Sequence, residues 1–103
     1  MMLELRPNCE LCDRDLPPDS TEACICTYEC TFCSNCVKTV LKNVCPNCGG
    51  GFSPRPIRPK TERRPGVSLH HDPATTKRVR TSYSVDEITA FSDEMRDIKP
   101  EDR

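Results

Sequence analysis

Apolar side chains occur in short runs between polar and charged residues, and their spacing predicts only a few regular elements. Residues 23–28 read as a short strand and residues 3–6 as an edge strand. Helical spacing after position 36 predicts an amphipathic helix with one apolar face, formed by Val37, Val40, Leu41 and Val44. The first half therefore offers a small set of core candidates: Leu11, Leu16, Ile25, Tyr28, Phe32, Val37, Val40, Leu41, Val44 and Phe52. A core of this size rarely stabilises a domain alone.

A narrower apolar stripe lies near the C-terminus. Ser84 and Glu87 stand three residues apart at its start, which is the signature of a capping box. We predict a helix over residues 85–97. Its apolar stripe contains Val85, Ile88, Phe91 or Ser92, and Met95. The stripe is narrow, and it could pack either on the rest of the chain or on a partner protein.

The charge pattern changes after residue 52. Residues 53–80 carry eight basic and two acidic side chains, whereas residues 81–103 carry three basic and seven acidic ones. We predict a folded domain over residues 1–52, a disordered, proline-rich basic linker over residues 53–82, and an acidic tail over residues 83–103 that holds the second helix. With a net charge of −1, the whole chain does not have the balance of a general nucleic-acid binder.

Eight of the nine cysteines form four ordered pairs, Cys9-x2-Cys12, Cys26-x3-Cys30, Cys33-x2-Cys36 and Cys45-x2-Cys48. Pairs at this spacing place two thiolates on one tetrahedral zinc ion, and a second pair completes the site. Four pairs predict two Zn²⁺ per chain. Since the binding energy of structural zinc, about 10 kcal/mol or more, is folding energy, we expect the metal-free chain to be unfolded.

Disulfides and iron–sulfur clusters are the other chemistries open to nine cysteines. The first residues lack the basic and apolar regions of a secretion signal, and no stretch is long and apolar enough to cross a membrane. In a reducing cytoplasm, paired cysteines favour metal binding over disulfides. We therefore expect a cytoplasmic zinc protein.

The full spacing, C-x2-C-x13-C-x3-C-x2-C-x2-C-x8-C-x2-C, resembles a RING finger with cysteine at the position usually held by histidine. That resemblance implies a small α+β cross-brace with a short β-hairpin and one central helix. It also implies interleaved sites, with Cys9, Cys12, Cys33 and Cys36 in site one and Cys26, Cys30, Cys45 and Cys48 in site two. Sequential pairing, as in stacked zinc ribbons, is the alternative.

Several longer segments carry a closer similarity: Leu3-Glu4-Leu5-Arg6-Pro7-Asn8-Cys9, Asp15-Leu16-Pro17-Pro18-Asp19-Ser20, Glu29-Cys30-Thr31-Phe32-Cys33, Cys45-Pro46-Asn47-Cys48-Gly49-Gly50, Arg55-Pro56-Ile57-Arg58-Pro59 and residues 73–79. In these segments the chain resembles a bacterial family called domain of unknown function 1272. The similarity extends to about residue 80. It implies a fold and a metal rather than a known activity.

Cys24 stands outside the four pairs. Residues two apart in a strand face the same side, so Cys24 is an alternative ligand to Cys26. The gap of three residues between Cys26 and Cys30 suits a metal knuckle better than the gap of five from Cys24. We expect Cys24 to be a spare thiol, which could also serve as the attacking thiol of a redox sensor.

Closed sites of four thiolates have no open coordination position for water or substrate, so the pattern predicts no enzymatic activity. We expect a structural module whose partner is another protein, with no membrane and no small-molecule substrate. In a ubiquitin-ligase-like alternative, the RING resemblance implies that Leu11 and Pro46 contact a conjugating enzyme, although Gly49 replaces the usual basic residue.

Nucleic-acid binding is the second alternative. The basic segment supplies residues that could contact phosphates, among them Arg55, Arg58, Arg63 and Arg64. The segment contains no interleaved aromatic residues for base stacking, which favours a solvated linker or a strip that docks on the acidic tail. His70 and His71 are expected to face solvent.

Overall fold

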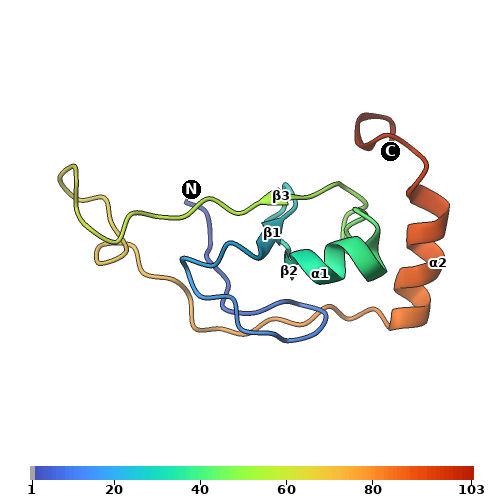
Figure 1. Ribbon diagram of the computed structural model, residues 1–103, viewed down its shortest axis with the longest axis horizontal. Helices are drawn as coiled ribbons and strands as arrows, with labels where there is room; N and C mark the ends of the chain where they lie inside the picture. Colours follow the sequence, from blue (N-terminus) through green and yellow to red (C-terminus); the bar gives the residue numbers. More distant parts are fainter. Residues whose placement is uncertain (1) are drawn as a thin grey trace.

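The computed structural model describes residues 2–103 as an elongated molecule of 46 × 27 × 21 Å (Figure 1). A three-stranded antiparallel sheet in the order β2-β1-β3 lies in its middle, formed by β1 (Ala23–Ile25), β2 (Thr31–Cys33) and β3 (Ser53–Pro54). A short helical segment follows β2, and helix α2 (Val85–Met95) lies at one end of the molecule. The predicted small α+β fold, with a hairpin and a helix directly behind it, is confirmed.

The β1–β2 hairpin is set by the second cysteine pair. Cys24 pairs with Phe32 in the ladder, and the Cys26 amide donates to the Cys30 carbonyl at 3.2 Å. The predicted strand over residues 23–28 is therefore shorter, because the chain leaves the ladder to form this turn. Tyr28, at the tip of the hairpin, is 73% exposed. The prediction that it belongs to the core is therefore wrong. Residues 3–6 form no strand, yet Leu5 is fully buried.

The helix after β2 is continuous but changes from α-helical to π-helical geometry. It begins as α1 (Ser34–Cys36), with Cys33 as its N-cap, and continues as a π-helical turn, η1 (Val37–Leu41). Lys42 ends it in the left-handed conformation, with its amide bonded to the Val37 carbonyl. The predicted amphipathic face is present only in part, because the helix stops before Val44. Both Leu41 and Val44 are nevertheless fully buried.

The apolar core is small and merges with the cysteines. Phe32 is fully buried at its centre and contacts Phe52 edge-to-face, with ring centroids 5.5 Å apart. Leu16 and Leu41 pack into the same cluster together with buried cysteines from all four pairs. The interior is therefore apolar side chains interleaved with thiols, and the cysteines supply much of its volume.

Helix α2 begins with the predicted capping box. Ser84 accepts from the Glu87 amide, and the Glu87 side chain accepts from the Ser84 amide. The helix ends at Met95, two residues before the predicted end. Ile88 is 2% exposed and belongs to the core, and the Ser92 hydroxyl donates to the Leu41 carbonyl at 2.8 Å. The C-terminal helix thus packs on η1; the 3-10 turn η2 (Pro100–Asp102) follows it.

Residues 55–82 run away from the sheet and return beneath the N-terminal loop to α2 (Figure 1). The structure does not show the expected disordered linker: this segment bonds to the N-terminal loop near both of its ends. The Thr75 amide donates to the Leu5 carbonyl at 3.1 Å, and the Thr81 amide to the Glu10 carbonyl at 2.9 Å. The Arg55 guanidinium is buried against main-chain carbonyls of the same loop. Carbonyl groups of the N-terminal loop, distant in sequence, thus order a segment whose composition is typical of a disordered linker.

Candidate metal centre

The first and last cysteine pairs form equivalent knuckles. In each, the residue after the second cysteine adopts a positive φ, 65° at Asp13 and 83° at Gly49. Its amide then donates to the carbonyl of the first cysteine, at 2.9 Å from Asp13 to Cys9 and 2.7 Å from Gly49 to Cys45. This turn brings both thiols of a pair to one side. Glycine adopts this left-handed conformation without strain. At Asp13 the same conformation is accompanied by a hydrogen bond that its side chain accepts from Asn8.

Cluster one consists of four thiols from the first and third pairs. The Sγ atoms of Cys9, Cys12, Cys33 and Cys36 all lie within 4.8 Å of one another. The Cys12 and Cys33 sulfurs are 3.8 Å apart. A tetrahedral zinc with bonds of about 2.3 Å requires sulfur–sulfur distances of about 3.8 Å, so the donor set fits that ion.

Cluster two brings together thiols from the second and fourth pairs. The Sγ atoms of Cys26, Cys45 and Cys48 lie within 4.8 Å of one another. Cys30 is buried beside them but is not part of this compact group. Cys48 is the exposed member. The structure therefore gathers the pairs in interleaved order, first with third and second with fourth, and leaves one predicted ligand slightly apart.

Backbone amides point at the sulfurs in both clusters. Cys36 donates to Cys33 Sγ at 3.4 Å, Tyr28 to Cys26 Sγ at 3.3 Å, and Gly50 to Cys48 Sγ at 3.4 Å. Hydrogen bonds of this kind stabilise thiolate more than neutral thiol. The knuckles thus prepare the sulfurs for the negatively charged form that binds metal.

Burial and mutual repulsion disfavour a full set of thiolates in either cluster. Burial, followed by the neighbouring Cys33 and Cys9, raises the pKa of Cys36 well above its ordinary value. Burial and the nearby Cys30 and Cys26 thiols likewise raise the pKa of Cys45, although the Asn47 amide opposes this. Four sulfurs in so small a volume cannot all be charged without a countercharge. A divalent cation supplies it, so the arrangement suits a metal rather than a set of free thiols.

Cys24 lies on β1, half-buried and outside both clusters. Burial raises the pKa of its thiol. His71 is also outside them: its Nδ1 is 3.0 Å from the Ser68 hydroxyl and its Nε2 is 3.3 Å from Glu62. Neither residue joins a metal-binding group in residues 2–103.

Glu10, inside the first knuckle, is a functional residue that sequence reasoning missed. It is 2% exposed, and its carboxylate accepts from the Thr31 amide at 2.6 Å, from Arg6 at 2.8 Å and from Asn47 at 3.2 Å. Glu10 itself lies between two ligands of cluster one, whereas Thr31 directly follows Cys30 and Asn47 lies in the knuckle of cluster two. One carboxylate therefore links the two clusters. Its position between Cys9 and Cys12 is its only sequence signal.

The predicted partner-binding residues occupy different environments. Arg55 is 4% exposed, and its guanidinium donates to the carbonyls of Arg6 and Pro17. Arg58 donates to the Leu3 and Asp72 carbonyls. Arg63 and Arg64 are exposed, Leu11 is half-buried and Pro46 is buried. Of the four arginines predicted to contact a partner, Arg63 and Arg64 are the two whose side chains are exposed.

Residues 2–58 match the family described as "Protein of unknown function (DUF1272)". The chain belongs to this family. A similar protein is an uncharacterized protein of Rhizobium meliloti (strain 1021), 58% identical over 78 residues, which cover 76% of this chain and 86% of that protein.

No solved structure matches the chain. In the part of the chain that the structure describes, no helix has the length and apolar character needed to cross a bilayer.

Proposed function

We propose that this protein is a structural zinc module that binds another protein. The observation that carries the proposal is the interleaved grouping of the cysteines, with four thiols in cluster one and three plus the adjacent Cys30 in cluster two. Sulfur-only donors in tetrahedral groups favour zinc over hard cations such as magnesium or calcium. Two zinc ions would brace a fold whose apolar core is too small to be stable alone.

The proposed role is non-catalytic. In a four-thiolate site, zinc has no free position for water or substrate, so it supplies folding energy rather than Lewis-acid chemistry. Thiolates remain available to zinc only in a reducing environment, which favours the cytoplasm. The surface around the two zinc sites would then serve to bind another protein.

Two alternatives have less support. For nucleic-acid binding, half of the basic residues of the segment are engaged within the chain, because Arg55, Arg58, Arg78 and Arg80 bond to main-chain carbonyls of the N-terminal region. For a ligase-like role, Pro46 is buried and lines a cleft with Tyr83 of the C-terminal segment. Both surfaces are partly occupied by the chain itself.

The test is the metal content of the intact protein, by native mass spectrometry, followed by chelation monitored by circular dichroism. The proposal predicts two zinc ions per chain and loss of the folded spectrum when both are removed. A folded metal-free chain, or a different metal, would contradict it.

A further inference from the structure

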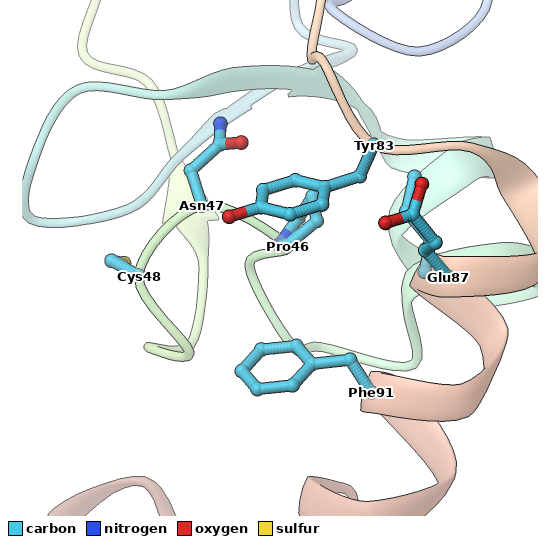
Figure 2. Close-up of a pocket in the computed structure, with 7 residues that line it drawn as sticks. Pro46, Asn47, Cys48, Tyr83, Glu87 and Phe91 are labelled. Carbon is cyan, nitrogen blue, oxygen red and sulfur yellow. The ribbon is translucent and has the colours of Figure 1, made fainter.

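A cleft of about 390 Å³ lies between the last knuckle and α2. We call it the aromatic cleft, because the rings of Tyr83 and Phe91 project into it from the C-terminal segment, with Cys48 on the opposite side (Figure 2). Its volume is within the range of sites that hold small groups. The lining consists of Pro46, Asn47, Cys48, Tyr83, Glu87, Ile88 and Phe91.

The lining of the aromatic cleft is acidic, and the nearby Arg103 guanidinium donates to the Gly49 carbonyl at 3.1 Å behind the knuckle. Among the described residues that line it, Glu87 is acidic and none is basic. Hydrogen bonds from the Ser84 backbone and side chain lower the pKa of Glu87, so it is ionised at neutral pH. Across from it, Cys48 belongs to cluster two, and four thiolates around one Zn²⁺ would carry a net charge of −2. Any ligand of this cleft is therefore selected for positive charge.

The aromatic rings favour the same ligand. A cation placed over the face of a tyrosine or phenylalanine is attracted by the negative potential of the ring. Tyr83 is 45% exposed, so its face is accessible. Pro46 and Ile88 add apolar walls, which suit the aliphatic part of a lysine or arginine side chain.

A second hollow of about 410 Å³ adjoins the aromatic cleft. It is lined by Tyr28, Cys30, Asn47 and Cys48, and so shares two residues with the cleft. Tyr28 is the most exposed aromatic residue of this surface. Because both hollows are lined by Asn47 and Cys48, a ligand longer than one side chain can reach both of them. This reach favours an extended polypeptide over a free organic cation.

We propose that the aromatic cleft receives a lysine or arginine side chain from a basic segment of a partner protein, whose backbone continues over the second hollow toward Tyr28. The inference rests on the proposed function, because it names the class of partner for the zinc module. Affinity depends on the carboxylate and the ring face, and falls as ionic strength rises.

The experiment is a titration of the zinc-loaded full chain, followed by amide nitrogen–proton NMR. The probe is the peptide Gly-Ser-Gly-Lys-Arg-Lys-Gly-Ser-Gly, and the control peptide carries glutamine at the three basic positions. The basic peptide is expected to shift the amide signals of Asn47, Cys48, Tyr83 and Phe91, and the control to leave them unchanged. Equal shifts with both peptides, or shifts confined to other regions, would overturn the proposal.

Matched variants separate the cleft from general electrostatics. Tyr83→Leu and Glu87→Gln are each expected to weaken binding about threefold to tenfold; glutamine retains the capping box. Asp86→Asn removes the same charge from the neighbouring position of α2 and is expected to change affinity by less than about twofold. Equal losses in Asp86→Asn and Glu87→Gln would reject a specific site.

Two further readouts keep the outcomes distinct. Native mass spectrometry of each variant reports whether both zinc ions remain, so loss of the module is recognised separately from loss of peptide binding. Sedimentation equilibrium tests a second copy as the occupant, since the exposed Lys60, Arg63 and Arg64 of another chain carry the same chemistry. A monomer across concentrations supports a partner protein, and association through these residues would overturn it.

Discussion

Glu10 lies in the middle of the first knuckle, where its carboxylate is shared among the Thr31 amide, Arg6 and Asn47. A charge at 2% exposure is tolerated only if its partners compensate for the lost hydration. Here the partners come from β2 and from the last knuckle, so the carboxylate couples the two clusters mechanically. The position of each cluster then depends on a residue that binds no metal.

Glu10→Ala is expected to lower the free energy of unfolding of the zinc-loaded protein by about 3 kcal/mol, since the buried Thr31 amide loses its acceptor and Arg6 loses one of its two carboxylate partners. Glu4→Ala removes the exposed partner of the same Arg6. That control is expected to cost less than about 1 kcal/mol. Urea unfolding at fixed zinc concentration measures both; equal losses would show that Glu10 does not couple the clusters.

Cys30 and Cys24 provide a second test at this scale. Cys30→Ser is expected to reduce the zinc content from two ions to one, because cluster two loses its fourth sulfur. Cys24→Ser, on the neighbouring strand, is expected to retain both ions. Native mass spectrometry counts them directly. If Cys24→Ser lost an ion and Cys30→Ser did not, the second cluster would need a different fourth ligand.

The residue scale also shows what the sequence can predict. Cysteine spacing points to two sites because both thiols of a pair are local in the chain, and the knuckle turns that orient them are local as well. Glu10 and Asn47 are 37 residues apart, and no periodicity links them. Hydrogen bonds between residues so far apart in the chain depend on the tertiary structure, so local sequence patterns do not predict them.

At the scale of elements, α2 is the part whose role the sequence leaves open. Its capping box and apolar stripe predict a helix, and the structure places the stripe against η1 through Ile88 and Ser92. Phe91 of the helix packs over Gly49, whose positive φ of 83° is set by the knuckle turn. The helix therefore completes the core of the zinc region and also forms one wall of the aromatic cleft.

Ile88→Ala is expected to lower the free energy of local unfolding of α2 by about 2–4 kcal/mol, because a buried side chain is removed from the contact with η1. Val85→Ala, at a 57% exposed position of the same helix, is expected to change it by less than about 0.5 kcal/mol. Hydrogen exchange of the α2 amides measures both. Similar exchange in the two variants would contradict the docked position of the helix.

At the scale of the whole molecule, residues 55–82 hold the N-terminal loop in place from both of their ends. Arg55 donates from one guanidinium to the carbonyls of Arg6, Leu16 and Pro17. Arg78 joins Asp13 and Asp15 at the surface. Composition describes residues 53–82 as an open basic linker because it counts charges and prolines. The acceptors that organise the segment are main-chain carbonyls, which carry no sequence signature.

Arg55→Lys is expected to destabilise the zinc-loaded protein by about 2 kcal/mol, since a lysine cannot donate to three separated carbonyls and leaves some of them buried without a donor. Arg63→Lys, at an exposed position of the same segment, is expected to have an effect within about 0.5 kcal/mol. Thermal unfolding of both variants at equal zinc occupancy provides the comparison. An unchanged stability in Arg55→Lys would show that the segment does not depend on this arginine.

The central claim is that two closed, sulfur-only metal sites build the molecule. Zinc-edge X-ray absorption of the loaded chain tests it most directly, because it reports the type, number and distance of the ligand atoms. The account predicts four sulfur ligands per zinc at about 2.3 Å and no lighter ligand. A nitrogen or oxygen ligand at about 2.0 Å would contradict it, since one site would then not consist of sulfur alone.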